Sequence, residues 1–376
     1  MKPKKIFGRQ IYKTWRKKVK KHLVSFLCPS YNHEKYISFF LDSLLAQTNP
    51  NWELIIVDDC STDNNINEIK KYDDKRIKLF QNPFNMGINS AINYAFKNAT
   101  GDIMAFVASD DILAPNYVED TIQEFDKKPD ADVLYCALQL MNNDGTLRSG
   151  NIWKQPKESR SVLLQKMFYF GNRMLSPGMA LQKTSFEKLY PLPIALSQYQ
   201  DYKMHIDIML KMNVITTDKP LVIYRKPSDK SGISVVNEAT LRTRKLEENM
   251  LMDSFLQIKD VAELSEIFGD EQIKQFGTMS NELIPFYLGK LALGANTEYK
   301  KVWGYNQIAR FINDKNNYML ANKLCGFCYA DFLKLSKYFD PVIVPDDNTK
   351  KYLKYKKLFN TLCILLAVSI ILLIIK

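Results

Sequence analysis

The sequence predicts an α/β fold whose core is a mostly parallel, twisted sheet with helices on its flanks. Two apolar runs that resemble buried strands, residues 54–57 and 103–107, each lead into a pair of adjacent aspartates. Between residues 23 and 111, segments with strand-like and helical spacing alternate along the chain. Because open α/β sheets bind ligands beyond the carboxyl ends of parallel strands, both acid pairs are candidates for a metal-nucleotide site.

The first strand and helix are expected between residues 23 and 45. A strand over residues 23–28 should stop at Pro29, and a helix should start near Glu34. The apolar residues of that helix recur on one face, at Ile37, Phe40, Leu41, Leu44 and Leu45.

The later elements repeat this alternation. A second strand is expected over residues 53–58, and a helix should begin beyond Ser61-Thr62-Asp63, whose short oxygen side chains can cap its free amides. Residues 77–80 read as a third strand. Gly87 should open a helix with apolar residues at helical spacing, and the next strand should end at Asp110-Asp111.

Short motifs in the first 235 residues resemble those of family 2 glycosyltransferases, which have the GT-A fold. In order, they are Pro29-Ser-Tyr-Asn32, Val57-Asp-Asp-Cys-Ser-Thr-Asp63, Asn85-Met-Gly87, Gly101-Asp102 and Ser109-Asp-Asp111. Later segments that fit the same family are Gln200-Asp201-Tyr202, Tyr224-Arg225 and Ser231-Gly-Ile-Ser234. Each motif alone is weakly specific, but the ordered set, which covers about residues 22–235, is specific.

The resemblance implies that a donor nucleotide binds at the strand ends. It assigns Asp59 to the nucleoside and the segment from Pro29 to Tyr31 to the base pocket. The donor-binding residues that it implies are Pro29, Ser30, Tyr31, Asn32, Asp58, Asp59, Asn85, Gly87 and Asp110. A structural alternative is that Asp58 and Asp59 only cap the turn that follows them.

A divalent cation, Mn²⁺ or Mg²⁺, is the expected cofactor. The diphosphate of a nucleotide sugar is negatively charged, so a cation held by a carboxylate would neutralise it and stabilise the departing nucleotide. We expect Asp111 to be the metal ligand and Asp110 to contact the ribose or the metal.

Asp201 is the candidate general base. An inverting transfer needs a carboxylate that takes the proton of the acceptor hydroxyl as its oxygen attacks the anomeric carbon. The transition state should resemble an oxocarbenium ion, and no covalent nucleophile is needed. The structural alternative for Asp201 is a helix N-cap. Relatives often carry an acidic residue where this chain has Gln200.

One position near the expected diphosphate departs from the family pattern, and one residue near the expected acceptor has two interpretations. Many relatives have an Ala-Arg-Asn segment where this chain has Ala91-Ile92-Asn93, so the phosphate charge would be met by the metal and by Arg225 or Lys230. Arg173 lies in a stretch that relatives use near the acceptor, and a surface loop is the alternative. The Gln-x-x-Arg-Trp signature of processive synthases is absent, so one sugar per encounter is expected.

The positive charge of the chain is concentrated at its start. The net charge is +11, but residues 1–21 hold ten Lys and Arg, which leaves 42 bases against 41 acids in the remainder. Phe7, Ile11, Trp15 and Val19 recur every four residues in this basic arm, as in a helix lying on an anionic membrane. A nucleic-acid-binding arm and a solvated tail are the alternatives.

The other terminus predicts a membrane anchor. Residues 358–375 are apolar, apart from mild polar groups, and long enough for a short transmembrane helix. Five lysines between residues 350 and 357 precede the segment and only Lys376 follows it, which predicts a tail anchor with the enzyme on the cytoplasmic face, at the inner membrane in a bacterium. A buried terminal helix and an interfacial hairpin are the alternatives.

The six cysteines do not form an obvious disulfide framework, and a reducing compartment is expected. Cys325-Gly-Phe-Cys328 has metal or redox spacing but lacks a second pair, so packing is favoured over zinc. A histidine-based metal site is not expected from only three histidines. We expect His205, four residues after Asp201, to lie on a helix surface, with an acceptor contact as the alternative.

These observations predict five regions. They are a basic amphipathic arm (1–21), a GT-A catalytic domain (22–235), a helical domain (236–345), a basic linker (346–357) and a tail anchor (358–375). Within the helical domain, residues 241–268 and 281–293 have the clearest helical character.

The predicted function is metal-assisted, inverting transfer of one sugar from a nucleotide sugar, with a UDP-sugar favoured, to a glycolipid or lipid-linked saccharide. The basic arm and the predicted tail anchor are the reason for expecting a lipid acceptor. No nucleic-acid partner is expected. Two alternatives remain at this point. One is a nucleotidyltransferase, which would release pyrophosphate, and the other is a catalytically silent nucleotide-sugar sensor or scaffold.

Overall fold

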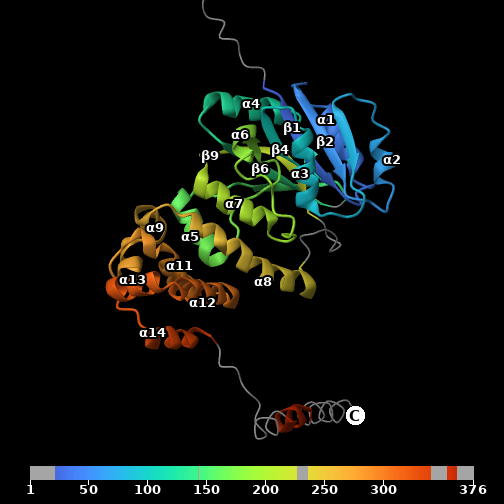
Figure 1. Ribbon diagram of the computed structural model, residues 1–376. Coiled ribbons are helices and arrows are strands. Elements are labelled where there is room, and N and C mark those ends of the chain that lie inside the picture. The colour runs from blue at the N-terminus through green and yellow to red at the C-terminus, as the bar shows by residue number, and fades with distance from the viewer. Residues whose placement is uncertain (1–21, 143, 227–235, 340–353, 362–376) are drawn as a thin grey trace, which may run out of the picture. The chain divides into compact units, whose positions relative to one another are not determined.

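Nine strands in the described residues form one mixed sheet. The structure, a computed structural model, describes residues 22–142, 144–226, 236–339 and 354–361 (Figure 1). The strands are β1 (Val24–Ser30), β2 (Trp52–Asp58), β3 (Ile77–Gln81), β4 (Ile103–Phe106), β5 (Ile112–Leu113), β6 (Val133–Met141), β7 (Leu147–Trp153), β8 (Ala180–Gln182) and β9 (Val214–Arg225). Their order is β3-β2-β1-β4-β8-β6-β9-β5, and β7 pairs with β6.

The first half of the sheet is parallel, as the sequence predicts. β1 pairs in parallel with β2 and β4, and β2 pairs in parallel with β3. The prediction of a mostly parallel sheet is wrong for the second half, where β6 and β9 are parallel but β8, β7 and β5 join by antiparallel pairing. Antiparallel neighbours need no helical crossover, so the alternation of strands and helices does not reveal them.

Two predicted strand ends lie elsewhere. β1 continues through Pro29 to Ser30 in its pairing with β2. Its pairing with β4 ends at Leu27, so the missing N–H of Pro29 costs no hydrogen bond to β4. β4 ends at Phe106 rather than at the second acid pair. The backbone from residue 107 onward leaves the sheet, and Asp111 N–H donates to the carbonyl of Ala108, so both aspartates lie in a loop.

Seven helices of the described chain accompany the sheet strands. They are α1 (Ile37–Leu45), α2 (Asn65–Ile69), α3 (Ile88–Asn98), α4 (Tyr117–Lys127), α5 (Arg160–Phe170), α6 (Lys183–Phe186) and α7 (Gln200–Lys211). The predicted apolar face of α1 is buried except for Leu45, which is 39% exposed. The core lies between such helix faces and strand residues such as Phe26, Ile56 and Ala105.

A helical region follows β9. It comprises α8 (Glu238–Met252), α9 (Val261–Phe268), α10 (Asp270–Lys274), α11 (Ile284–Leu293), α12 (Glu298–Asn313), α13 (Lys315–Cys325) and α14 (Tyr329–Leu333), with the 3₁₀ helix η1 (Asp253–Gln257) after α8. Figure 1 shows α7 between strands β6 and β9 and the helices α8 and α12. Phe168 of α5 stacks edge to face on Phe255 and Phe268, each at 4.9 Å between ring centroids, which joins this region to the sheet domain.

The described residues up to Phe332 group as one compact unit, and those from Leu333 onward form a second. The second unit holds the 3₁₀ helix η3 (Lys334–Tyr338) and the helical residues 354–361. Across the described ranges, no helix combines the length and apolarity needed to cross a bilayer. The predicted basic arm and most of the predicted tail anchor lie outside the described residues.

Candidate active site

Asp58, at the end of β2, is bound entirely to its own turn. Its side chain is fully buried; Oδ1 accepts from Asn65 Nδ2 at 2.8 Å and Oδ2 accepts from the N–H of Ser61 at 2.9 Å. This geometry matches the turn-capping alternative for Asp58, because both oxygens already have protein donors.

Asp59 organises the loop that precedes α3. Its Oδ1 accepts from Asn82 Nδ2 at 2.7 Å and from the N–H of Met86 at 2.8 Å, and its Oδ2 accepts from the N–H of Gly87 at 2.8 Å. Gly87 has a φ of +85°, which a residue with a side chain rarely adopts. Asp59 therefore fixes the loop that carries the exposed Asn85, while one lone pair of Oδ2 remains for a ligand donor.

The ends of β1 and β2 are tied together beside these carboxylates. Asn32 N–H donates to Ser61 Oγ at 2.9 Å, and Asn32 Oδ1 accepts from the N–H of Thr62 at 2.8 Å. Ser30, which follows Pro29 in β1, is buried, whereas the ring of Tyr31 is 42% exposed. The arrangement presents Tyr31 at the strand ends, where its ring can stack on a base.

Asp111 has the most unusual environment in residues 107–111, the loop after β4 that we call the acid loop. Its side chain is 2% exposed, Oδ1 accepts from the N–H of Arg225 at 2.9 Å, and Oδ2 has no partner among the residues that the structure describes. Burial and then the charge of Asp110 raise the pKa of Asp111 well above its ordinary value, and the Arg225 N–H opposes this only in part. A buried carboxylate oxygen without a partner, beside a second carboxylate, fits a cation.

The protein supplies few ligands for such a cation. In the described part of the chain, no group of three or more His, Cys, Asp and Glu side chains is arranged to hold a metal ion. Mg²⁺ is commonly held by one or two carboxylates together with substrate phosphates and water. Asp111 and Asp110 fit that type of site, in which the donor completes the coordination.

Arg225 supports the acid loop from the end of β9. Its Nε donates to the carbonyl of Asp110 at 3.0 Å, and its guanidinium lies 4.6 Å from the ring centroid of Tyr36 and 5.8 Å from that of Phe39. Arg225 is only 3% exposed. Lys230, the other predicted phosphate contact, lies outside the described residues.

His33 is a further neighbour of the acid loop that the sequence did not indicate. Its Nδ1 lies 2.7 Å from Oγ of the buried Ser109, which directly precedes the acid pair.

Ile92, where many relatives have arginine, is buried at 6% exposure and belongs to the core. Ile92 itself therefore supplies no charge for a phosphate group.

Asp201, in the first turn of α7, lies in a cluster of polar side chains. Its Oδ1 accepts from the N–H of Tyr202 at 2.7 Å, and its Oδ2 lies 3.1 Å from Ser176 Oγ and 3.3 Å from Asn172 Nδ2. His205 is the fourth member of the cluster. Its Nε2 lies 3.2 Å from Ser176 Oγ, and its Nδ1 lies 3.0 Å from Asn172 Oδ1.

The prediction that His205 lies on a helix surface is wrong. His205 is fully buried and its ring packs edge to face on Tyr135, at 5.5 Å between centroids. Burial lowers the pKa of His205 to about 4, although the charge of Asp201 opposes the shift. His205 is therefore neutral near pH 7, and no periodic signal reveals its burial because most of α7 is buried on every side.

Tyr224, which precedes Arg225 in β9, is affected by the charges of the acid loop and of Asp201. Burial, followed by the charges of Asp111, Asp110 and Asp201, raises the pKa of Tyr224 to about 12. Tyr224 is therefore neutral near pH 7.

The neighbours of Asp201 match their predicted roles unevenly. Gln200 has a buried Oε1 without a partner in the described chain. Arg173 is exposed, with its guanidinium 5.9 Å from the ring centroid of Phe170, which agrees with the surface-loop alternative.

The cysteine pair lies in the helical region. Cys328 Sγ donates to Asp331 Oδ2 at 3.1 Å, and burial raises the pKa of Cys325.

A glutamate of the helical region caps the segment before α7. Glu247 of α8 is 3% exposed, and its carboxylate accepts four hydrogen bonds of 2.7–2.9 Å. The donors are the N–H and Oγ of Ser197 and the N–H groups of Gln198 and Tyr199. Sequence spacing gave no sign of this contact, which spans about 50 residues.

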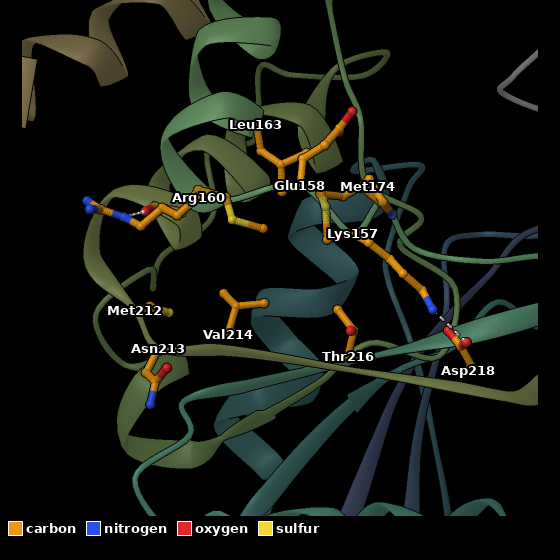
Figure 2. A pocket seen from close by; sticks show the side chains of 12 residues that line it. Lys157, Glu158, Arg160, Leu163, Met174, Met212, Asn213, Val214, Thr216 and Asp218 are labelled. Carbon is orange, nitrogen blue, oxygen red and sulfur yellow. Dashed lines mark hydrogen bonds and ion pairs between the residues drawn. The ribbon is translucent and has the colours of Figure 1, made fainter. Parts of the chain in front are cut away.

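A hollow of about 570 Å³ is lined by residues of α5, α7 and β9 and of the loops beside them (Figure 2). Met174, Met209 and Met212 contribute to its lining, and the Lys157–Asp218 ion pair of 3.1 Å lies at its side. None of the residues predicted to bind donor, metal or acceptor lines it.

Comparisons with known proteins agree on one family. A model of the family "Glycosyl transferase family 2" matches residues 25–189. The Escherichia coli protein WfgD, named UDP-Glc:alpha-D-GlcNAc-diphosphoundecaprenol beta-1,3-glucosyltransferase, is 30% identical over 216 residues, which are 57% of this chain and 80% of WfgD. An uncharacterized glycosyltransferase of Haemophilus influenzae is 24% identical over 330 residues, covering 84% of this chain and 87% of the relative.

Solved structures show the same fold. The crystal structure of S. aureus TarS 1-349 in complex with UDP-GlcNAc superposes with a TM-score of 0.53 at 23% identity and covers 80% of this chain and 90% of that chain. The structure of the same protein with UDP gives a TM-score of 0.52 at 22% identity, with the same coverage.

Proposed function

Because this chain belongs to glycosyltransferase family 2 and has the GT-A fold, we propose that it transfers a single sugar from a UDP-sugar to a lipid-linked saccharide, with inversion at the anomeric carbon. WfgD, by its name, uses UDP-Glc and a diphosphoundecaprenol-linked GlcNAc, and the TarS structures contain UDP or UDP-GlcNAc. These names support the uridine donor and the lipid-linked acceptor.

The observation that carries the proposal is the buried carboxylate of Asp111, whose Oδ2 has no partner in the described chain and which lies beside Asp110. It supports a donor site with a cation at the acid loop, and Asp201 is the separate carboxylate that we assign to the acceptor. Retention through a covalent intermediate would need a nucleophile close to the anomeric carbon, whereas inversion needs only one base.

The chemistry assigned to the chain is a single displacement. The acceptor oxygen bonds to the anomeric carbon while the bond from that carbon to the diphosphate breaks, and the diphosphate leaves with the electron pair. Asp201 takes the proton of the acceptor hydroxyl. The exposed ring of Tyr31 stacks on the base, and Asp59 accepts from the nucleoside through its remaining lone pair.

Asp111, with Asp110 beside it, would hold Mn²⁺ or Mg²⁺. When bound, this cation neutralises charge on the leaving diphosphate. We assign Arg225 to the support of the acid loop rather than to direct phosphate contact, because it is buried and its Nε is engaged with Asp110.

A location at the cytoplasmic face of a membrane completes the proposal. Its support is the apolar segment 358–375 with lysines before it and the basic residues of 1–21, both read from the sequence. An enzyme held at the surface meets a lipid-linked acceptor in two dimensions, whereas a soluble acceptor gives no such advantage.

The test is UDP release and sugar transfer by the full-length protein in lipid nanodiscs. A panel of UDP-sugars and lipid-linked saccharides would be offered with Mn²⁺, with Mg²⁺ or with a chelator. We expect turnover of one donor, its loss on chelation, and a fall of at least about 100-fold in Asp201→Asn, as removal of a general base produces. Asp111→Asn should raise the Mn²⁺ concentration needed for half-maximal activity.

Asp73→Asn, at an exposed carboxylate, is the matched control and should retain wild-type activity. Donor binding without turnover of any sugar would contradict the proposal and favour a sensor. Release of pyrophosphate instead of UDP would favour a nucleotidyltransferase.

A further inference from the structure

Strands β6 and β9 extend beyond the end of β4. Leu134 of β6 lies level with Ala105 of β4, because both pair with Ala180 of β8. β4 ends at Phe106, whereas β6 continues to Met141 in parallel with β9, and β7 pairs with this last part of β6. We call residues 138–141 and 222–225, together with β7, the strand extension. The acid loop runs from β4 to β5, which lie on opposite sides of β6 and β9 in the sheet, so it passes the strand extension.

Two aromatic rings share one face of the strand extension. Trp153 of β7 pairs with Leu138, and Tyr224 of β9 pairs with Leu140, two residues further along β6. Paired residues, and every second residue along a strand, have side chains on the same face. The two rings meet accordingly, with their centroids 6.3 Å apart and their planes 31° apart. At about 3.3 Å per residue, Trp153 lies roughly 13 Å beyond the level at which Leu134 and β4 align.

The strand extension lies beside the acid loop and away from the predicted nucleoside residues. Tyr224 precedes Arg225, whose N–H donates to Asp111 Oδ1 at 2.9 Å. Tyr31 and Asp59 follow β1 and β2, which lie on the other side of β4 from β6 and β9. The ring of Trp153 is therefore on the side of the acid loop that the nucleoside leaves free.

The segment after Trp153 binds the loop that contacts the proposed base. Gln155 Nε2 donates to the carbonyl of Leu175 at 3.0 Å, and Gln155 Oε1 accepts from the N–H of Leu175 at 3.1 Å. The next residue, Ser176, donates from Oγ to Asp201 Oδ2 at 3.1 Å. β7 thus places Trp153 near the acceptor side of the site.

Trp153 is the exposed one of the three tryptophans that the structure describes. Its side chain is 38% exposed, whereas Trp52 and Trp303 are 1% and 2% exposed. Lys226, also exposed, holds its Nζ 5.2 Å from the ring centroid of Trp153. A partly exposed indole fixed by a sheet, with an ammonium group over it, suits a ligand that has both an apolar face and a negative charge.

We propose that Trp153 and Lys226 bind the glycosyl phosphate end of the acceptor, with a pyranose ring stacked on the indole and the ammonium group at the phosphate beside that sugar. The proposal rests on the proposed function, in which the acceptor is a lipid-linked saccharide. The C–H groups on one face of a pyranose form an apolar surface that packs on an aromatic ring. A phosphate attracts the exposed ammonium group of Lys226 more strongly than the indole does, so this group leaves the ring face when the sugar binds.

Steady-state kinetics of the full-length protein with two water-soluble acceptors test the proposal. Both carry the saccharide of the acceptor that is turned over, one as a diphosphate with a short alkyl chain and one as a neutral alkyl glycoside. Trp153→Leu should raise the KM of both acceptors by about 10-fold without changing kcat or the KM of the UDP-sugar, and Trp153→Phe should raise it less. Lys226→Gln should raise the KM of the diphosphate acceptor alone, also by about 10-fold.

Matched controls are an exposed aromatic and an exposed lysine elsewhere in the described chain. Tyr329→Leu in α14 and Lys97→Gln in α3 should leave every constant unchanged. An unchanged acceptor KM in Trp153→Leu would overturn the proposal, as would a parallel rise in the KM of the UDP-sugar. Equal effects of Lys226→Gln on the two acceptors would also contradict it. A defect seen in nanodiscs but with neither soluble acceptor would show that Trp153 contacts the membrane instead.

Fluorine NMR of the full-length protein labelled with 5-fluorotryptophan gives a readout that needs no catalysis. The chain has four tryptophans, so the signal that disappears in Trp153→Phe is that of Trp153. The probes are hexose and N-acetylhexosamine 1-phosphates, the corresponding methyl glycosides and inorganic phosphate. We expect the 1-phosphates to move the Trp153 signal most, and Lys226→Gln to weaken their effect but not that of the methyl glycosides. A Trp153 signal that no sugar moves would overturn the proposal.

The two readouts separate this proposal from the proposed function. If no UDP-sugar is turned over but a glycosyl phosphate moves the Trp153 signal, the proposed transfer fails and the binding site stands. If transfer is normal and Trp153→Leu leaves the acceptor KM unchanged, the proposed function stands and the binding site fails.

Discussion

Replacing Glu247 with glutamine should lower the melting temperature of the protein by roughly 4 to 8 °C. The carboxylate of Glu247 accepts two hydrogen bonds on each oxygen from the segment 197–199, directly before α7. Glutamine has the same shape but only one oxygen. With the amide oxygen toward Gln198 and Tyr199, the NH₂ faces Ser197, whose hydroxyl can turn to accept from it, so the N–H of Ser197 loses its acceptor.

The magnitude follows from that lost acceptor and from the loss of the charge that strengthens the other bonds. An unpaired donor costs about 1–3 kcal/mol, so the substitution should cost about 2 kcal/mol. In a domain of more than about 150 residues, 1 kcal/mol shifts the melting temperature by about 2–4 °C. The N–H groups of Ser197, Gln198 and Tyr199 should also exchange with solvent faster.

Thermal unfolding by circular dichroism and amide hydrogen exchange by mass spectrometry measure these effects. The control is Glu238→Gln on the same helix, where the carboxylate is 87% exposed and 3.4 Å from Arg242, and where a change within about 1 °C is expected. A Glu247→Gln shift no larger than that of the control, with unchanged exchange at 197–199, would refute the reasoning.

Two further predictions concern stability. Burial alone would raise the pKa of Glu53, but hydrogen bonds from Lys78 and from hydroxyl and amide donors outweigh burial and hold the pKa at about 2. The melting temperature should therefore fall as the pH drops from about 4.5 to 2. Glu53→Gln should flatten that fall. Gly178→Ala should destabilise the fold by more than about 2 kcal/mol in urea unfolding, because the φ of Gly178 is +74° and a Cβ would lie 2.4 Å from Val222 Cγ2. Gly145 has a φ of +87° but open space around it, so Gly145→Ala should cost only about 1 kcal/mol. Equal losses in the two alanine variants would show that the close contact is unimportant, and parallel pH curves would remove Glu53 as the cause of acid sensitivity.

The first half of the sheet could be predicted because its local pattern and its neighbours agree. β1 and β2 are buried on both faces, so each appears as a continuous apolar run, and the intervening α1 shows a clear apolar stripe. The second half lacks such signals. β8 has three residues and joins β4 and β6 by antiparallel pairing, which depends on contacts between distant segments.

The candidate site divides in the same way. The acid pairs could be found because they follow apolar runs and match family motifs. Asn172 and Ser176 could not, because they lie in a loop 29 and 25 residues before Asp201 and meet it only through the fold. His205 was misplaced because α7 is covered both by the sheet and by the later helices, so its polar and apolar residues show no face.

The two hydrogen bonds from Arg225 to the acid loop have a consequence for synthesis of the chain. The N–H and Nε of Arg225 bind Asp111 and Asp110 across more than 110 residues of sequence. During translation, a ribosome that has completed the chain through Asp111 has made every predicted donor and metal ligand but not Arg225, which binds both aspartates. A nascent chain therefore acquires an ordered acid loop only after β9 has emerged, and fragments that stop before it should fold their parallel strands without gaining donor affinity.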